Sequence, residues 1–67
     1  MKKYTNQQIS DLIDEHIHSA RNRKILKYRF IDGYTLRKIA EFEDIDLSEK
    51  QVGTIIRDNL IELEQYL

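Results

Sequence analysis

Apolar residues recur along the chain at intervals of three or four positions, the spacing that places them on one side of an α-helix. Four such stretches follow one another, each with polar or charged residues between the apolar ones. In chain order, their apolar faces are Ile9, Leu12, Ile13 and Ile17; Ile25, Leu26, Tyr28 and Phe30; Leu36, Ile39 and Ala40; and Val52, Ile55, Ile56, Leu60, Leu63 and Leu67. The pattern predicts an all-α fold of four helices without strands.

Residues with side-chain hydroxyl groups stand where each helix is expected to begin. Such a residue accepts a hydrogen bond from a free backbone N–H group of the first turn, and a glutamine three positions later can bond back to it. The predicted caps are Thr5, Ser19, Thr35 and Ser48, and the first and last of them have this glutamine. Gly33 is expected to end the second helix in a left-handed conformation, which glycine adopts without strain.

The length of 67 residues allows one small domain, which buries only about 60% of the surface of its unfolded chain. Cysteine is absent, so neither disulfides nor thiolate metal sites can support the fold. Proline is also absent and glycine occurs only twice, which favours helices with short connections. No apolar run is long enough for a membrane span or a signal segment, so we expect a cytoplasmic protein with no membrane partner.

The net charge is −1, but the charges are unevenly distributed. Residues 1–38 carry nine Lys/Arg and four Asp/Glu, which gives +5, whereas residues 39–67 carry two and eight, which gives −6. Such a polarity can orient a small domain on a polyanion or on a partner of mixed charge.

The segment from Arg21 to Leu63 has a distinctive order of residues. A basic and apolar helix is followed by Gly33, Thr35, Leu36, Ile39, Ala40, Ser48 and Val52. This order resembles region 4 of bacterial sigma factors and the related phage helix-turn-helix regulators. The resemblance implies one domain, residues 1–67, with the helix-turn-helix at 34–59. The gap from Ala40 to Ser48 is two residues longer than is usual there, and Asp46 stands near the usual turn glycine.

The resemblance also implies a DNA-binding transcriptional regulator with double-stranded DNA as its partner. The Ser48-capped helix would enter the major groove, with contacts from Ser48, Lys50, Gln51, Gly53, Thr54 and Arg57. The preceding helix would contact phosphates through Thr35, Arg37 and Lys38, and secondary phosphate contacts would come from Arg21, Arg23, Lys24 and Lys27. Lysine and arginine can donate to guanine, and glutamine can pair with adenine.

Four features of these regions are also compatible with roles that involve no DNA. The basic run and the polar face of the last helix are what an ordinary solvated helix shows. Gly53 costs the helix roughly 1 kcal/mol relative to alanine, which a close approach of DNA or of a partner helix would explain. The acidic turn would repel phosphates, and it suits instead a protein-binding inhibitor of a host RNA polymerase or defence nuclease. The docking residues would then be Glu41, Glu43, Asp44 and Asp46.

The sequence gives little support for a catalytic site or a metal-binding site. His16 and His18, two positions apart on a helix, would point to different faces, and no third ligand accompanies them. The serines lack a paired base and no glycine-rich phosphate loop is present, so we expect neither an enzyme nor a cofactor.

The apolar end of the last helix either closes the core against the first helix or forms a homodimer interface. This end comprises Leu60, Leu63, Tyr66 and Leu67.

Overall fold

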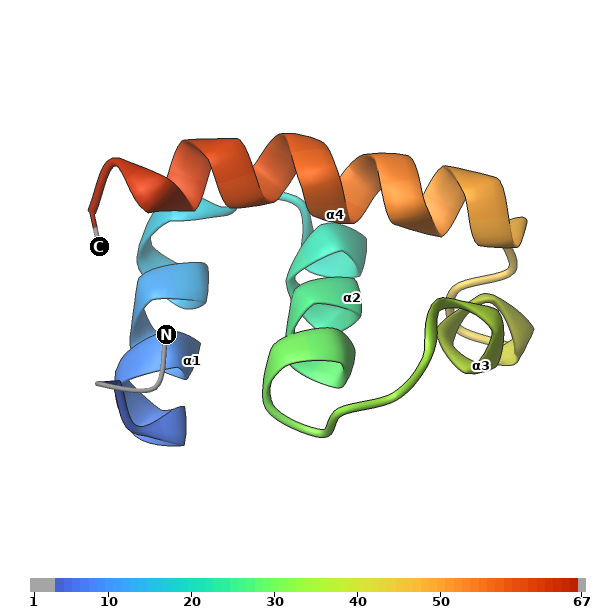
Figure 1. Cartoon of the computed structure of the whole chain (residues 1–67), viewed down its shortest axis with the longest axis horizontal. Helices are drawn as coiled ribbons and strands as arrows, with labels where there is room; N and C mark the ends of the chain where they lie inside the picture. Colours follow the sequence, from blue (N-terminus) through green and yellow to red (C-terminus); the bar gives the residue numbers. More distant parts are fainter. Residues whose placement is uncertain (1–3, 67) are drawn as a thin grey trace.

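The computed structural model describes residues 4–66, which form four α-helices and no strands. The helices are α1 (Asn6–His16), α2 (Ala20–Phe30), α3 (Leu36–Glu41) and α4 (Glu49–Glu64). In Figure 1, α1 and α2 stand side by side beneath the long α4, and the short α3 lies under the N-terminal end of α4. The prediction of an all-helical fold is confirmed. None of these helices is long and apolar enough to span a bilayer.

Each helix begins at the residue that the sequence predicts. The hydroxyl group of every cap accepts a hydrogen bond from the backbone N–H group three residues later, in Thr5, Ser19, Thr35 and Ser48. Gln8 and Gln51 complete capping boxes, because their Oε1 atoms accept from the cap N–H groups at 2.9 and 3.0 Å. Local hydrogen bonding therefore determines where the helices start.

The two longer connections each contain a residue in the left-handed region. Gly33 has a φ of +77°, as predicted, but α2 ends at Phe30, so the glycine shapes the turn beyond the helix. The N–H group of Tyr34 then donates to the Tyr28 carbonyl at 3.0 Å. In the connection from α3 to α4, Asp46 has a φ of +50°. Aspartate is one of the few residues other than glycine that adopt this conformation at moderate cost.

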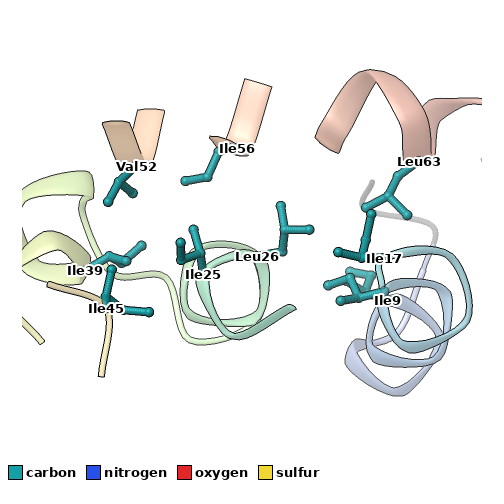
Figure 2. Close-up of a cluster of buried hydrophobic side chains, with 10 residues drawn as sticks. Ile9, Ile17, Ile25, Leu26, Ile39, Ile45, Val52, Ile56 and Leu63 are labelled. Carbon is teal, nitrogen blue, oxygen red and sulfur yellow. The ribbon is translucent and has the colours of Figure 1, made fainter. Parts of the chain in front are cut away.

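Ten apolar side chains form one continuous core: Ile9, Ile13, Ile17, Ile25, Leu26, Ile39, Ile45, Val52, Ile56 and Leu63. Figure 2 shows Ile39, Ile45 and Val52 together at one end and Ile9, Ile17 and Leu63 at the other. All but Ile45, which comes from the connection before α4, belong to the predicted apolar faces. Leu63 therefore closes the core of the monomer against α1. Leu67 lies outside the described residues.

Three aromatic rings attach α3, only six residues long, to α2. The ring of Tyr28 lies 4.7 Å from that of Phe42 and 5.9 Å from that of Tyr34, measured between centroids. The rings of Tyr34 and Phe42 meet edge to face at 5.2 Å, a favourable arrangement. The predicted core residues Tyr28 and Phe30 are thus only partly buried, at the edge of the core.

Candidate nucleic-acid interface

The outward side of α4 carries a stripe of exposed residues, Lys50, Thr54, Arg57 and Ile61, which we call the α4 stripe. Their spacing of four, three and four positions aligns them along the helix. Val52, Ile56 and Leu63 occupy the opposite side and are buried. In Figure 1 no other described helix covers the outer side of α4. The stripe therefore presents two cations and a hydroxyl group to solvent.

The start of α3 flanks the α4 stripe on one side. A Cβ atom added to Gly53 would lie 3.5 Å from Cδ1 of Leu36, the first residue of α3. The residues next to Leu36 that were predicted to contact phosphates are exposed: Thr35, Arg37 and Lys38. The contact of 3.5 Å is an ordinary van der Waals distance, so within the described chain nothing approaches Gly53 so closely that only glycine fits.

A surface groove of about 360 Å³ flanks the stripe on the other side. It is lined by Arg21, Leu47, Lys50, Gln51, Thr54 and Ile55. Successive residues of a helix are rotated by about 100°, so Ile55 and Gly53 point to opposite flanks of α4. The half-buried Leu47 and Ile55 form an apolar floor, and Arg21 and Lys50 supply positive charge beside it. Leu47 belongs to this groove although its sequence context gave no indication of a functional role.

Two arginines of the basic helix α2 bind carbonyl groups of the domain itself. Nη1 of Arg23 donates to the carbonyls of Ile17 and His18 at 2.8 and 2.9 Å, which joins α2 to the connection that follows α1. Nη1 of Arg29 donates to the Tyr34 carbonyl at 3.0 Å in the next turn. These guanidinium groups hold the ends of neighbouring elements.

Both lysines of α2 form ion pairs within the domain. Nζ of Lys27 lies 2.8 Å from Oδ1 of Asp14 in α1, and Nζ of Lys24 lies 3.4 Å from Oδ2 of Asp44. Arg21 has neither a hydrogen bond nor an ion pair with any of the residues 4–66. Of the four predicted secondary phosphate contacts, the structure thus places only Arg21, unpaired, beside α4.

Several predicted DNA-contacting side chains already have a local role. The hydroxyl groups of Ser48 and Thr35 cap α4 and α3. Oε1 of Gln51 accepts from the Ser48 N–H group, so a pairing with adenine that uses both amide atoms would compete with the capping box. Nε of Arg57 lies 3.5 Å from Oδ1 of its neighbour Asp58, and both side chains are more than 60% exposed. Such an exposed pair is weak and leaves Arg57 available.

The acidic turn is partly neutralised from inside the domain. Oδ2 of Asp44 accepts a hydrogen bond from the Tyr28 hydroxyl group at 3.0 Å and pairs with Lys24. This hydrogen bond, together with burial and the negative charge of Asp44, raises the pKa of Tyr28 above its ordinary value of 10.0. The other residues predicted for protein docking, Glu41, Glu43 and Asp46, are exposed.

A second hollow, of about 390 Å³, lies beside the C-terminal half of α4. It is lined by His16, Ile17, His18, Ser19, Asn22, Asp58, Asn59 and Glu62. Its two carboxylates, Asp58 and Glu62, disfavour phosphate, so of the two halves of α4 only the N-terminal one is compatible with phosphate.

The two histidines do not share a helix as expected. α1 ends at His16, whose ring stacks on that of Tyr66 at 3.6 Å, and His18 lies in the connection to α2. Among the described residues, no group of three or more His, Cys, Asp or Glu side chains could hold a metal ion.

Comparison with models of known protein families, with curated proteins and with solved structures finds no match for this chain. Its function must therefore be inferred from the geometry of α4 and the basic residues beside it.

Proposed function

We propose that this chain is a DNA-binding transcriptional regulator of the sigma region 4-like helix-turn-helix type. The N-terminal half of α4 enters the major groove. One observation carries the proposal: Lys50, Thr54 and Arg57 face outward in one line, and the cations on both sides of this line form no ion pair within residues 4–66. The 16 residues of α4 extend roughly 24 Å, and a major groove about 12 Å wide admits a helix.

The arrangement of α3 and α4 supports this proposal. The two helices follow one another and cross, since α3 is seen end-on in Figure 1 while α4 runs across the view. The connection between them, residues 42–48, turns at Asp46 and is anchored by the buried Ile45. Two crossed helices, the second with a free outer face, suit a helix-turn-helix, and the connection of seven residues is longer than the usual turn of three or four.

Each part of the surface has a distinct role in the proposal. Lys50, Thr54 and Arg57 reach base edges, where lysine and arginine donate to guanine. Thr35, Arg37 and Lys38 lie at the flank where α3 begins and contact the phosphates of one strand. Arg21, on the opposite flank, contacts the other strand. Such phosphate contacts fix the position of a helix in the groove, whereas base contacts give specificity.

Selection from random DNA duplexes, followed by affinity measurements over a range of salt concentrations, tests this function. Each neutralised phosphate contributes about −0.9 to the slope of log K against log salt concentration. The five cations Arg21, Arg37, Lys38, Lys50 and Arg57 predict a loss of several hundred-fold in affinity between about 50 and 200 mM salt. Failure to bind any duplex at about 50 mM salt refutes the proposal.

The alternative, an inhibitor that docks through the acidic turn, has less support because Asp44 already bonds to Tyr28 and Lys24. It predicts binding to a basic protein that survives charge reversal at Lys50 and Arg57. The same variants therefore separate the two functions.

A further inference from the structure

The surface groove beside the α4 stripe contains a side chain whose amide group has a fixed orientation. Oε1 of Gln51 accepts a hydrogen bond from the Ser48 N–H group at 3.0 Å, and only the oxygen atom of the amide can accept there. The nitrogen atom Nε2 therefore occupies the other position of this planar group. Gln51 is exposed and lines the groove, and its Nε2 forms no hydrogen bond with any of the residues 4–66. Gln51 thus offers its donor to the groove while its acceptor is engaged in the cap.

The floor of the groove next to this donor is apolar. Ile55 follows Gln51 by four positions, so it lies on the same flank of α4, rotated by about 40° towards the buried side. Ile55 and Leu47 are half-buried, because one part of each side chain packs against the core and the other part lines the groove. Such a surface suits an apolar group rather than a polar one.

A cation completes the groove on the side of α2. Arg21 is exposed, and its guanidinium group has neither a hydrogen bond nor an ion pair within residues 4–66. From α4 towards α2, the groove therefore presents a hydrogen-bond donor, an apolar floor and an unpaired cation.

The edge of a thymine base in the major groove has matching groups in the same order. Its O4 atom accepts a hydrogen bond, and its methyl group is attached to the neighbouring ring atom C5. C5 is closer than C4 to the glycosidic nitrogen, so the methyl group lies between O4 and the backbone of its own strand. The phosphates of that backbone follow next.

We propose that this surface groove recognises a thymine, an inference that rests on the proposed function. Nε2 of Gln51 donates to O4 of the base, and the 5-methyl group lies against Ile55 and Leu47. Arg21 binds a phosphate of the strand that carries the thymine. Gln51 and Ile55 are thereby specificity-determining residues, in addition to those of the α4 stripe.

The other three bases match the groove less well. Adenine presents an acceptor and a donor, so pairing with it requires Oε1 of Gln51, which already binds the Ser48 N–H group. Cytosine presents an amino group, which would face the donor of Gln51. Guanine accepts a hydrogen bond but has no methyl group for the apolar floor. Only thymine uses both the donor and the floor.

Uracil, which lacks only the methyl group of thymine, tests the apolar contact. Each thymine of a duplex selected by the wild type is replaced in turn. At one position, uracil should lower the affinity of the wild type about fourfold, as expected for the loss of one buried methyl group. Ile55→Ala should reduce this ratio to less than about twofold. Both duplexes bind the same variant, so a loss of stability affects both equally and cancels from the ratio.

Ile61→Ala is the matched control for Ile55→Ala. It shortens the same type of side chain on the same helix, but Ile61 is exposed outside the groove. The fourfold ratio between thymine and uracil should therefore remain.

Gln51→Glu tests the hydrogen bond to O4. Glutamate keeps an oxygen atom for the Ser48 N–H group, so the capping box is retained, but an acceptor replaces the donor. The wild type should prefer a T·A pair over a C·G pair at this position by about tenfold. The variant should prefer C·G, because the cytosine amino group donates to a carboxylate. Comparing two duplexes with one variant removes the general repulsion between glutamate and phosphates, and circular dichroism verifies that the helices are retained.

Three results overturn the inference: equal affinities for thymine and uracil at every position, a ratio that Ile55→Ala leaves at fourfold, or a Gln51→Glu variant that still prefers T·A. If the wild type binds duplexes with any of these results, the proposed function stands and only the thymine contact is refuted. Failure to bind any duplex refutes the proposed function and the thymine contact together.

Discussion

α2 and α4 both carry lysine and arginine side chains, but they place them in different surroundings. In α2, Arg23 and Arg29 donate to backbone carbonyls, and Lys24 and Lys27 pair with carboxylates of neighbouring elements. In α4, Lys50 has no partner within the described chain, and Arg57 has only its exposed neighbour. A cation that is already paired must give up that pair before it can bind a phosphate. The pairing of the cations, rather than their density in the sequence, therefore indicates where an anionic ligand can bind.

The largest expected effect separates these two helices by charge reversal. Lys50→Glu with Arg57→Glu should lower the affinity for a selected duplex more than about 100-fold at 50 mM salt, because two contacts become repulsions. Lys24→Glu with Lys27→Glu changes the net charge equally, but the new glutamates face Asp44 and Asp14 inside the domain and not the DNA, so the affinity of the folded domain should fall less than about fivefold. Fluorescence anisotropy with labelled DNA measures both. Equal losses would show that net charge alone governs binding.

Two arginines of α2 allow a narrower test, on stability. Arg23→Ala should lower the free energy of unfolding by about 1–2 kcal/mol, because it leaves the carbonyls of Ile17 and His18 without their charged donor. Arg21→Ala should leave stability within about 0.5 kcal/mol, as for most surface substitutions. It should instead reduce the salt slope of DNA binding by about 1. Urea denaturation and salt titration measure these effects, and a stable Arg23→Ala variant would contradict the structural role of Arg23.

The features that the sequence predicts correctly are local ones. Helix starts follow from hydroxyl residues such as Ser48, whose partner lies three positions away, and the buried faces follow from the helical period. The position of Asp46 near an expected glycine is visible in the sequence, and the structure adds its left-handed conformation. The partners of Arg23 and Lys24 cannot be predicted in this way, because they depend on how α2 packs against distant segments. For the same reason, the groove floor at Leu47 becomes apparent only in the fold.

Gly53 tests whether the binding side of α4 can be separated from its packed side. Gly53→Ala should raise the free energy of unfolding by about 0.5–1 kcal/mol, since alanine favours the helix and its Cβ atom would meet Leu36 at an ordinary distance. The affinity for DNA should stay within about twofold because this Cβ atom points towards α3. Gly33→Ala is the matched control: its φ of +77° should make alanine destabilising by roughly 1 kcal/mol or more. A stabilised Gly53→Ala variant that loses DNA binding would instead indicate that DNA approaches at this position.

The smallest expected effect concerns the hydrogen bond that the Tyr28 hydroxyl group donates to Asp44 in the acidic turn. The hydrogen bond to Asp44 raises the pKa of the Tyr28 hydroxyl group in the folded state. Its contribution to stability is therefore complete below the unfolded pKa near 10 and is lost as the pH rises through the higher folded pKa. Tyr28→Phe should lower the free energy of unfolding by about 0.5 kcal/mol at neutral pH, and this difference from the wild type should vanish above the folded pKa. Urea denaturation on both sides of that pKa measures the difference, with Tyr34→Phe as the control, because the Tyr34 hydroxyl group makes no hydrogen bond within residues 4–66. A difference that persists in alkali would contradict this account, because it would mean that the Tyr28 oxygen stabilises the fold by some means other than donating its proton to Asp44.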